Sequence, residues 1–250
     1  MPPPSVTLVI PAYREGTRLP PLLASLVAEA AAAPPTEILV VDDGSGPAER
    51  EREEEAVRAT QAALERADSP HRARFVAAPA NRGKGGAIRL GWASADPASE
   101  WLGFLDADGA VSAREAWRLV RLLPALPDVD ALAGARILMA GRSIRRSLVR
   151  HLQGRVFATF VERAFHLGFY DTQCGLKLFR ASRLRPLLPR LVEDRWLLDV
   201  EVLALLARSG ARMREEPIDW ADPGGSKVIP GLDALRMASG LWRMRRRLSP

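Results

Sequence analysis

The chain has 250 residues and 47% of them are hydrophobic, so it can bury a full core and is not a disordered chain. Its single cysteine, Cys174, excludes an internal disulfide, and we expect neither a signal peptide nor a membrane span, because no run reaches roughly 18 apolar residues. The net charge of +6 is concentrated in residues 142–163 and in the tail, a distribution that suits nucleic acid, anionic lipid or phosphorylated substrates.

The first part of the chain is expected to alternate strands and helices. Short apolar or β-branched runs that end at turn residues predict strands over 5–10, 37–41, 73–77 and 101–105. Helical spacing predicts helices over 17–33, 47–67 and 83–95. This alternation indicates an α/β fold with a doubly wound, mostly parallel sheet.

The second part is less regular. We expect helices over 112–123, 143–168 and 196–209, strands over 129–135 and 212–218, and a loop entering a strand over 169–179. A basic helix should close the chain. The sequence has no internal repeat and no clear linker, so we interpret 1–250 as a single domain with halves 5–111 and 112–230 and a C-terminal helix over 231–250.

Three polar clusters follow three of the predicted strands: Ala12–Glu15, Asp42–Ser45 and Asp106–Asp108. Because ligands of doubly wound sheets bind beyond the carboxyl ends of the strands, these clusters predict a site at one edge. In an extended strand Asp106 and Asp108 would point the same way, as two oxygen ligands for Mg²⁺ or Mn²⁺. Taken alone, this D-x-D pattern is more often an ordinary acidic turn.

Two further motifs have both a functional and a structural interpretation. Asp43 in VVDDGS either belongs to the site or caps the next helix. The stretch NRGKGG, residues 81–86, is either a phosphate-binding nest with Lys84 or a helix start. Its spacing is neither that of a P-loop nor that of a dinucleotide fingerprint.

Several motifs, taken in order, resemble the inverting family 2 glycosyltransferases, and most of all the dolichyl-phosphate β-glucosyltransferases and other polyprenyl-phosphate glycosyltransferases. The motifs are VIPAYRE (9–15), VVDDGS (40–45), NRGKGGAIRLG (81–91), DAD (106–108), DTQCGLKLF (171–179), LDVEVL (198–203) and SKV (226–228). The resemblance implies a GT-A fold, a nucleotide-sugar donor held by residues 5–111, an acceptor held by 112–230, and a divalent metal, Mg²⁺ or Mn²⁺.

The resemblance also implies roles for particular residues. Nucleotide-sugar binding falls to Pro11, Ala12, Tyr13, Glu15, Val41, Asp43, Lys84, Asp106, Ala107 and Arg136. Acceptor binding falls to Arg146, Gln173 and Lys227, and metal binding to Asp106 and Asp108, of which Asp108 is the principal catalytic ligand. One departure is Gly109-Ala110-Val111 after the D-x-D motif, where relatives carry a side-chain ligand; water or a substrate oxygen would fill that position.

The acceptor decides whether a catalytic base is needed. A lipid phosphate is already anionic near neutral pH, whereas a hydroxyl acceptor requires a base, for which Asp199 is the candidate and Glu201 the second. Asp199 is equally well explained as a structural pairing residue. The resemblance favours transfer of glucose from UDP-glucose to a polyprenyl phosphate; the alternative is a family 2 enzyme acting on a hydroxyl of a small molecule or lipid.

The basic stretches 142–168 and 231–247 predict contact with a membrane surface, with Phe157, Phe160, Phe165 and Leu167 as apolar contacts. The structural alternative is an ordinary helix that faces the core and has a solvated basic side. We expect a peripheral protein at the inner, cytoplasmic face of the membrane and no nucleic-acid partner. A nucleotidyltransferase and a non-enzymatic phosphate- or nucleic-acid-binding protein explain the acidic loops less well.

Overall fold

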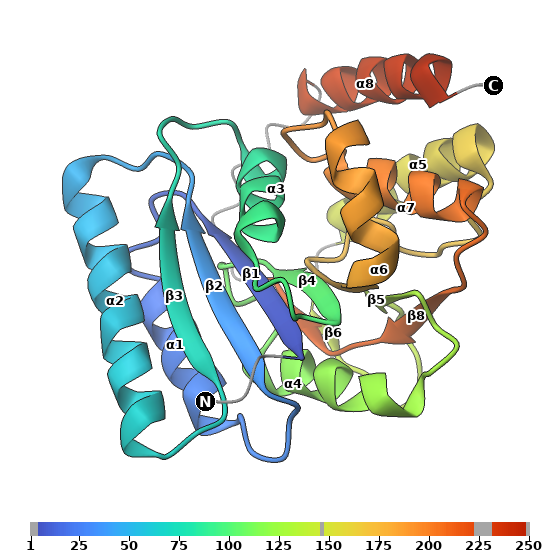
Figure 1. Cartoon of the computed structure of the whole chain (residues 1–250). Coiled ribbons are helices and arrows are strands. Elements are labelled where there is room, and N and C mark those ends of the chain that lie inside the picture. Colours follow the sequence, from blue (N-terminus) through green and yellow to red (C-terminus); the bar gives the residue numbers. More distant parts are fainter. Residues whose placement is uncertain (1–4, 146–147, 223–231, 249–250) are drawn as a thin grey trace.

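A seven-stranded sheet forms the centre of the computed structural model, which describes residues 5–145, 148–222 and 232–248 (Figure 1). The strand order is β3-β2-β1-β4-β7-β5-β8. The strands are β1 Val6–Ala12, β2 Thr36–Asp42, β3 Arg72–Ala77, β4 Trp101–Leu105, β5 Ala131–Ala135, β7 Leu176–Arg180 and β8 Met213–Pro217. Strand β7 is antiparallel to β4 and β5, and the other neighbours in this sheet are parallel. The predicted mostly parallel sheet is therefore confirmed.

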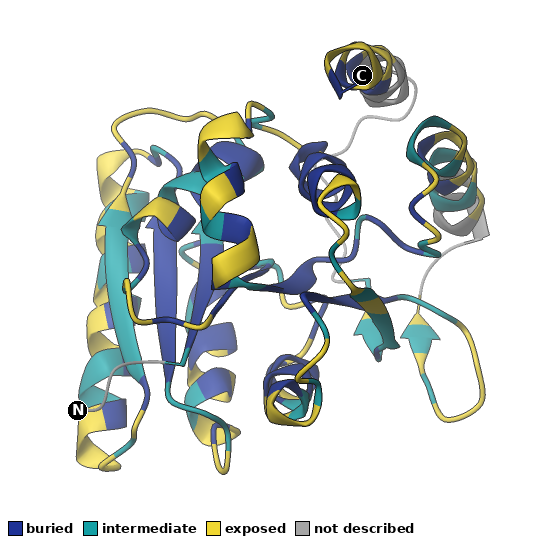
Figure 2. Cartoon of the chain, turned by 45° about the vertical axis from the view of Figure 1, so that its right-hand side comes forward, coloured by how far each residue is buried: buried dark blue, intermediate teal, exposed yellow. Residues whose placement is uncertain are grey.

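Helices cover both faces of this sheet, which is why it is doubly wound (Figures 1 and 2). One face carries α1 (Leu19–Ala28), α2 (Pro47–Arg66) and α4 (Ala113–Leu122) with the 3₁₀ turn η1 (Leu123–Ala125). The other face carries α3 (Lys84–Ser94), α6 (Ala181–Leu184), η2 (Arg185–Arg190) and α7 (Leu198–Arg208), with α5 (Leu148–Phe165) and α8 (Leu232–Leu248) farther out. A small second sheet pairs β6 (Ile144–Arg145) with β9 (Trp220–Ala221).

The strands are buried on both sides. In β1, Leu8 and Ile10 pack against the α1 side, whereas Val9 packs against the α3 side. A strand covered on both faces needs apolar residues at nearly every position, as the run VTLVI provides. Because β2, β1 and β4 are adjacent and parallel, their carboxyl ends lie next to one another at a single edge of the sheet.

Some predicted boundaries are wrong. The helix predicted over 143–168 is shorter, because residues 144–145 form β6 and α5 begins at Leu148. The helix predicted over 17–33 begins at Leu19, with Pro20 in its first turn, where the missing N–H of proline does no harm. Helix α4 begins as expected after Ser112, whose hydroxyl accepts a hydrogen bond from the Glu115 N–H.

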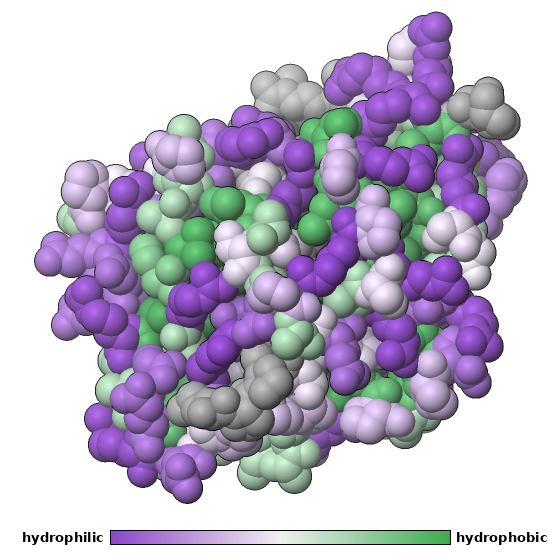
Figure 3. Space-filling model, in the orientation of Figure 1, coloured by the Kyte–Doolittle hydropathy of each residue, from purple (hydrophilic) through white to green (hydrophobic). Residues whose placement is uncertain are grey.

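Hydrophilic residues cover most of the face seen in Figure 3, including the upper right, where α8 lies. Among the residues described, no helix is both long enough and apolar enough to cross a bilayer.

Candidate active site

The sheet topology brings the three predicted polar clusters to one edge. Strands β2, β1 and β4 are adjacent and parallel, so the loops after Ala12, Asp42 and Leu105 leave the sheet on the same side. Two of the loops touch directly: the Asp43 N–H donates to the Ala12 carbonyl at 2.8 Å, and the Arg14 N–H donates to the Ser45 hydroxyl at 2.9 Å. This edge is the candidate active site.

Asp106 is the best anchored carboxylate of the site. Its N–H donates to the Gly175 carbonyl at 2.9 Å, and its Oδ1 lies 2.7 Å from the Lys84 Nζ. A Cβ at position 175 would lie only 2.3 Å from the Asp106 Oδ2. The glycine in the DTQCG motif is therefore required for the carboxylate of the D-x-D motif to lie where it does.

Two lysines, the half-buried Lys84 and the fully buried Lys177, connect Asp106 to Asp199. The Lys84 Nζ lies 3.9 Å from an Asp199 oxygen, and the fully buried Lys177 donates to the Asp199 Oδ1 at 2.8 Å. Lys177 also donates to the Cys174 carbonyl at 2.7 Å. Burial raises the pKa of Asp106, and the nearby Asp108 and Asp199 carboxylates add to this rise, while Lys84 opposes it. The site thus gathers three carboxylates around two ammonium groups.

The site can hold a divalent cation, although not by the strand geometry that the sequence suggested. Strand β4 ends at Leu105, so Asp106 and Asp108 lie in the following turn and not along the strand. Asp108 is half-buried, and its Oδ1 accepts the Ala110 N–H at 3.0 Å. Within the described residues no cluster of three or more His, Cys, Asp or Glu side chains could hold a metal. Two carboxylates fit Mg²⁺ or Mn²⁺ if substrate and water supply the remaining oxygens.

The predicted donor-binding residues of the first loop lie at this edge. Ala12 is buried at the end of β1, and Pro11 and Tyr13 are half-buried. Glu15 is buried, and both of its oxygens accept hydrogen bonds from Arg18 at 2.6 Å. The Glu15 carboxylate therefore stabilises the start of α1 by binding Arg18.

Two other predicted donor contacts have structural partners. The Val41 side chain is fully buried and packs in the core, one residue before the end of β2. Asp43 does not cap the next helix, which begins after Gly46; its oxygens accept the N–H groups of Arg82 and Gly83 at 2.8 and 2.7 Å. Burial raises the pKa of Asp43 despite these two hydrogen bonds.

The nest interpretation of NRGKGG is wrong for three of its N–H groups. Those of Arg82 and Gly83 go to Asp43, and that of Gly86 goes to the Asp194 carbonyl at 3.0 Å. Lys84 remains directed at the site, since its Nζ contacts Asp106 and lies 4.9 Å from the centre of the Phe104 ring. Ala107 is buried beside these groups.

Arg136 lies farther along, after β5, and is held by Asp171. Its Nε and Nη2 donate to the two Asp171 oxygens at 2.6 and 2.8 Å, and its guanidinium lies 5.5 Å from the Trp220 ring centre. Burial would raise the pKa of Asp171, but Arg136 outweighs it and holds that pKa at about 2. The pair is thus an ion pair throughout the neutral range.

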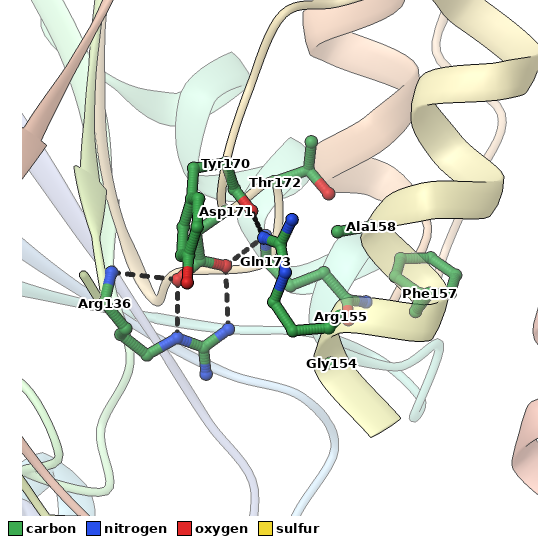
Figure 4. A pocket seen from close by; sticks show the side chains of 9 residues that line it. All are labelled: Arg136, Gly154, Arg155, Phe157, Ala158, Tyr170, Asp171, Thr172 and Gln173. Atoms are coloured by element: carbon green, nitrogen blue, oxygen red, sulfur yellow. Dashed lines mark hydrogen bonds and ion pairs between the residues drawn. The ribbon is translucent and has the colours of Figure 1, made fainter. Parts of the chain in front are cut away.

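A small pocket beside this ion pair contains Gln173 (Figure 4). Figure 4 shows Arg136 and Arg155 approaching Asp171 and Tyr170 from opposite sides. Arg155, on α5, donates to the Tyr170 carbonyl at 2.9 Å and stacks 4.0 Å from the Tyr170 ring centre. The Thr172 hydroxyl is buried and has no hydrogen-bond partner among the residues that the structure describes. The pocket is therefore a polar cradle with an arginine that has no ion pair among the described residues.

Sequence reasoning missed Lys177, Arg155 and Thr172. A lysine within the apolar strand run LKLF was a signal for Lys177, because a buried ammonium needs a carboxylate partner. No comparable signal distinguished Arg155 from the other arginines of α5. Arg146 and Lys227, predicted to bind the acceptor, lie outside the described residues.

Comparisons with known proteins agree with this geometry. Residues 7–186 match the family described as Glycosyl transferase family 2. Dolichyl-phosphate beta-glucosyltransferases from Drosophila melanogaster and Homo sapiens are each 31% identical; the alignments cover 95% and 96% of this chain and 73% and 78% of those proteins.

Solved structures share the fold. Glucosyl-3-phosphoglycerate synthase from Mycobacterium tuberculosis superposes with a TM-score of 0.66 at 15% identity, over 98% of this chain and 79% of that one. A mannosyltransferase from Pyrobaculum calidifontis superposes with a TM-score of 0.63 at 20% identity, over 100% of this chain and 66% of that one. The chain therefore belongs to glycosyl transferase family 2, and it is a glycosyltransferase with the GT-A fold.

Proposed function

We propose that this enzyme transfers a hexose, with inversion and with the help of a divalent metal, from a nucleotide sugar to a polyprenyl phosphate. Glucose from UDP-glucose is the donor that we expect. The proposal is supported by the similarity to the dolichyl-phosphate beta-glucosyltransferases. The glucosyl-3-phosphoglycerate synthase with a similar fold is known in complexes with Mn²⁺ and UDP-glucose, and the mannosyltransferase in a complex with GDP-Man and Mn²⁺.

The observation that carries the choice of acceptor is the environment of Asp199. Its carboxylate accepts a hydrogen bond from the buried Lys177 at 2.8 Å and lies 3.9 Å from Lys84. The Asp199 Oδ1 is thus occupied by the ammonium group of a fully buried lysine, which needs a carboxylate partner. A site whose candidate base is held in this way suits an acceptor that is already anionic, such as a phosphate.

The chemistry then needs no proton removal. An oxygen of the acceptor phosphate attacks the anomeric carbon, the bond from that carbon to the diphosphate oxygen breaks, and the nucleoside diphosphate leaves. Asp106 and Asp108 would hold Mg²⁺ or Mn²⁺, which neutralises charge on the leaving diphosphate. Lys84 fixes the Asp106 carboxylate and adds positive charge at the same place.

The pocket of Figure 4 is the place that we assign to the acceptor phosphate. Arg155 and Gln173 line it, and the unpartnered Thr172 hydroxyl lies buried at its wall. Charge-assisted hydrogen bonds from arginine are strong and suit phosphate oxygens. Arg136 orders the pocket through Asp171.

We also propose that the enzyme works at the cytoplasmic face of the membrane, with α5 against the lipid. Of the four apolar contacts that the sequence suggested, only Phe160 is exposed; Phe157, Phe165 and Leu167 pack against the core. The exposed side of α5 instead presents Leu152, Val156 and Phe160, spaced four residues apart and therefore on one face. Such a stripe beside arginines is typical of helices that lie in a membrane interface.

Replacement of Asp199 by Asn separates the two acceptor classes. With a lipid phosphate acceptor we expect the variant to keep transfer within about tenfold of wild type, whereas loss of a general base lowers the rate by about 10²–10⁴-fold. Wild type and variant would be assayed with UDP-glucose on a polyprenyl phosphate and on the corresponding polyprenol. Donor affinity and thermal unfolding serve as controls for the loss of the Lys177 partner.

Transfer to the polyprenol alone, abolished by this substitution while donor binding persists, would contradict the proposal and favour the hydroxyl-acceptor enzyme.

A further inference from the structure

Two carboxylates of α2 hold the loop that joins β1 to α1. The Glu53 Oε1 accepts the Glu15 N–H at 2.8 Å, and the Glu49 Oε2 accepts the Gly16 N–H at 3.2 Å. The two glutamates are four residues apart, so they lie on the same face of the helix. A Cβ at Gly16 would lie 2.7 Å from the Glu49 Oε2, so the loop backbone lies directly against the helix.

This contact fixes an unusual backbone conformation. Arg14 has a φ of +56°, in the left-handed region, which costs about 1 kcal/mol or more for a residue with a side chain. On the other side of the loop, the Arg14 N–H donates to the Ser45 hydroxyl. The loop Tyr13–Gly16 is thus held in place by α2 and by the turn after β2.

Glu53 differs from Glu49 in how completely it is buried. Its side chain is fully buried, and within the described part of the chain its Oε2 has no hydrogen-bond partner. Glu49, by contrast, is partly exposed and pairs with Arg52 at 2.9 Å. A buried, unpaired carboxylate is much more costly than a buried neutral carboxyl group, so the surroundings of Glu53 favour its protonated form.

The groups around Glu53 act in the same direction. Burial raises the pKa of Glu53 to about 7, and although the Glu15 N–H opposes this, the Asp42, Glu15 and Glu49 carboxylates add to it. The nearby cations are already paired: Arg18 with Glu15, Arg50 with Asp42 and Arg52 with Glu49. No described cation forms an ion pair with Glu53 itself.

We propose that Glu53 is a positioning residue for the donor site, and that its uncharged form holds the loop Tyr13–Gly16 in the conformation that binds the nucleotide. This rests on the proposed function, in which that loop contacts the donor. When Glu53 ionises, an unpaired charge appears inside the protein, beside the carboxylates of Asp42, Glu15 and Glu49. The loop then moves away from α2, and donor binding weakens.

The pH dependence has a definite sign. An acid whose pKa is raised in the ordered state holds its proton there up to about pH 7. Between the ordinary glutamate pKa of 4.5 and about 7, disorder of the loop releases that proton, so nucleotide binding weakens as the pH rises to about 7 and is nearly independent of pH above it. For a single proton the limit is about a tenfold change in Kd per pH unit.

The test is calorimetric titration of the full chain with UDP and Mg²⁺ between about pH 5 and pH 8, a range that covers both the pH-dependent region and the plateau above about pH 7. We expect the Kd of wild type to rise at least about threefold over this range. Glu53→Gln keeps an oxygen for the Glu15 N–H but cannot ionise, so its Kd should stay nearly constant. Glu54→Gln is the matched control, because Glu54 is partly exposed and pairs with Arg58; the dependence of its Kd on pH should follow that of wild type.

If the Kd for UDP changes equally with pH in wild type and in Glu53→Gln, the inference is overturned while the proposed function stays intact. Absence of UDP binding by wild type at every pH would overturn both.

Hydrogen exchange provides a measurement on wild type alone, for the case in which Glu53→Gln does not fold. After correction for the intrinsic rate, protection of the Glu15 and Gly16 amides should fall as the pH rises from about 5 to about 7. Protection that stays constant across this range would overturn the inference.

Discussion

Gly175 shows how one residue can decide where a carboxylate of the candidate active site lies. Its carbonyl accepts the Asp106 N–H, and its missing side chain leaves room for the Asp106 carboxylate. The D-x-D motif and the DTQCG motif, far apart in the sequence, are therefore parts of a single arrangement. Lys84 completes it from a third segment.

Replacement of Gly175 by Ala should abolish most of the transfer activity. The new Cβ would lie 2.3 Å from the Asp106 Oδ2, so the carboxylate must move. A displacement of about 1 Å at a catalytic group can lower the rate about 10²-fold. The measurement is kcat/KM for glucosyl transfer, with thermal unfolding to confirm the fold.

Gly46→Ala is the control for this substitution, because a Cβ at Gly46 would meet nothing within 4 Å and its φ is −62°. Activity of Gly175→Ala close to that of Gly46→Ala would show that the position of Asp106 is not critical.

At the scale of elements, β7 and α5 determine the second half of the site. Strand β7 is antiparallel between β4 and β5, and it brings Lys177 beside Asp199 on α7. Helix α5 supplies Arg155 to the pocket and carries the exposed stripe of Leu152, Val156 and Phe160. One helix thus presents an arginine to the site and an apolar face to the outside.

The triple variant Leu152→Ser, Val156→Ser, Phe160→Ser should bind lipid vesicles at least about tenfold more weakly than wild type, because each lost apolar contact is worth about 1 kcal/mol or more. Co-sedimentation with vesicles containing anionic lipid measures this. The donor affinity should not change, since the stripe faces away from the pocket residues.

Val192→Ser is the matched control, because Val192 is 50% exposed and lies outside α5. Equal vesicle binding by the triple variant and the control would rule out the α5 stripe as the membrane contact.

At the scale of the whole molecule, the sequence predicted what depends on local pattern and order. The alternation of apolar runs and helical segments was sufficient for the mostly parallel sheet, and the rule for strand ends placed the three acidic loops together. The resemblance supplied the family. These features depend on short segments and on their order along the chain.

What the sequence could not predict depends on packing between distant segments. The partners of Arg136 and Asp199 are Asp171 and Lys177, and nothing in the local pattern selects them from the other charges of the chain. The burial of Glu53 was hidden for the same reason, since α2 is otherwise a charged helix with exposed acids. The break between β6 and α5 also escaped prediction, because β6 pairs with the distant β9.

The central claim is metal-dependent glucosyl transfer to a lipid phosphate, and one assay tests it most directly. Purified protein would be incubated with Mg²⁺ or Mn²⁺, a panel of nucleotide sugars and a short polyprenyl phosphate, and both the released nucleotide and the glycosylated lipid would be measured. We predict UDP release and glucosyl-lipid from UDP-glucose, both lost in Asp108→Ala and on removal of the metal. Failure to turn over any nucleotide sugar with this acceptor, or activity unchanged in Asp108→Ala, would contradict the account.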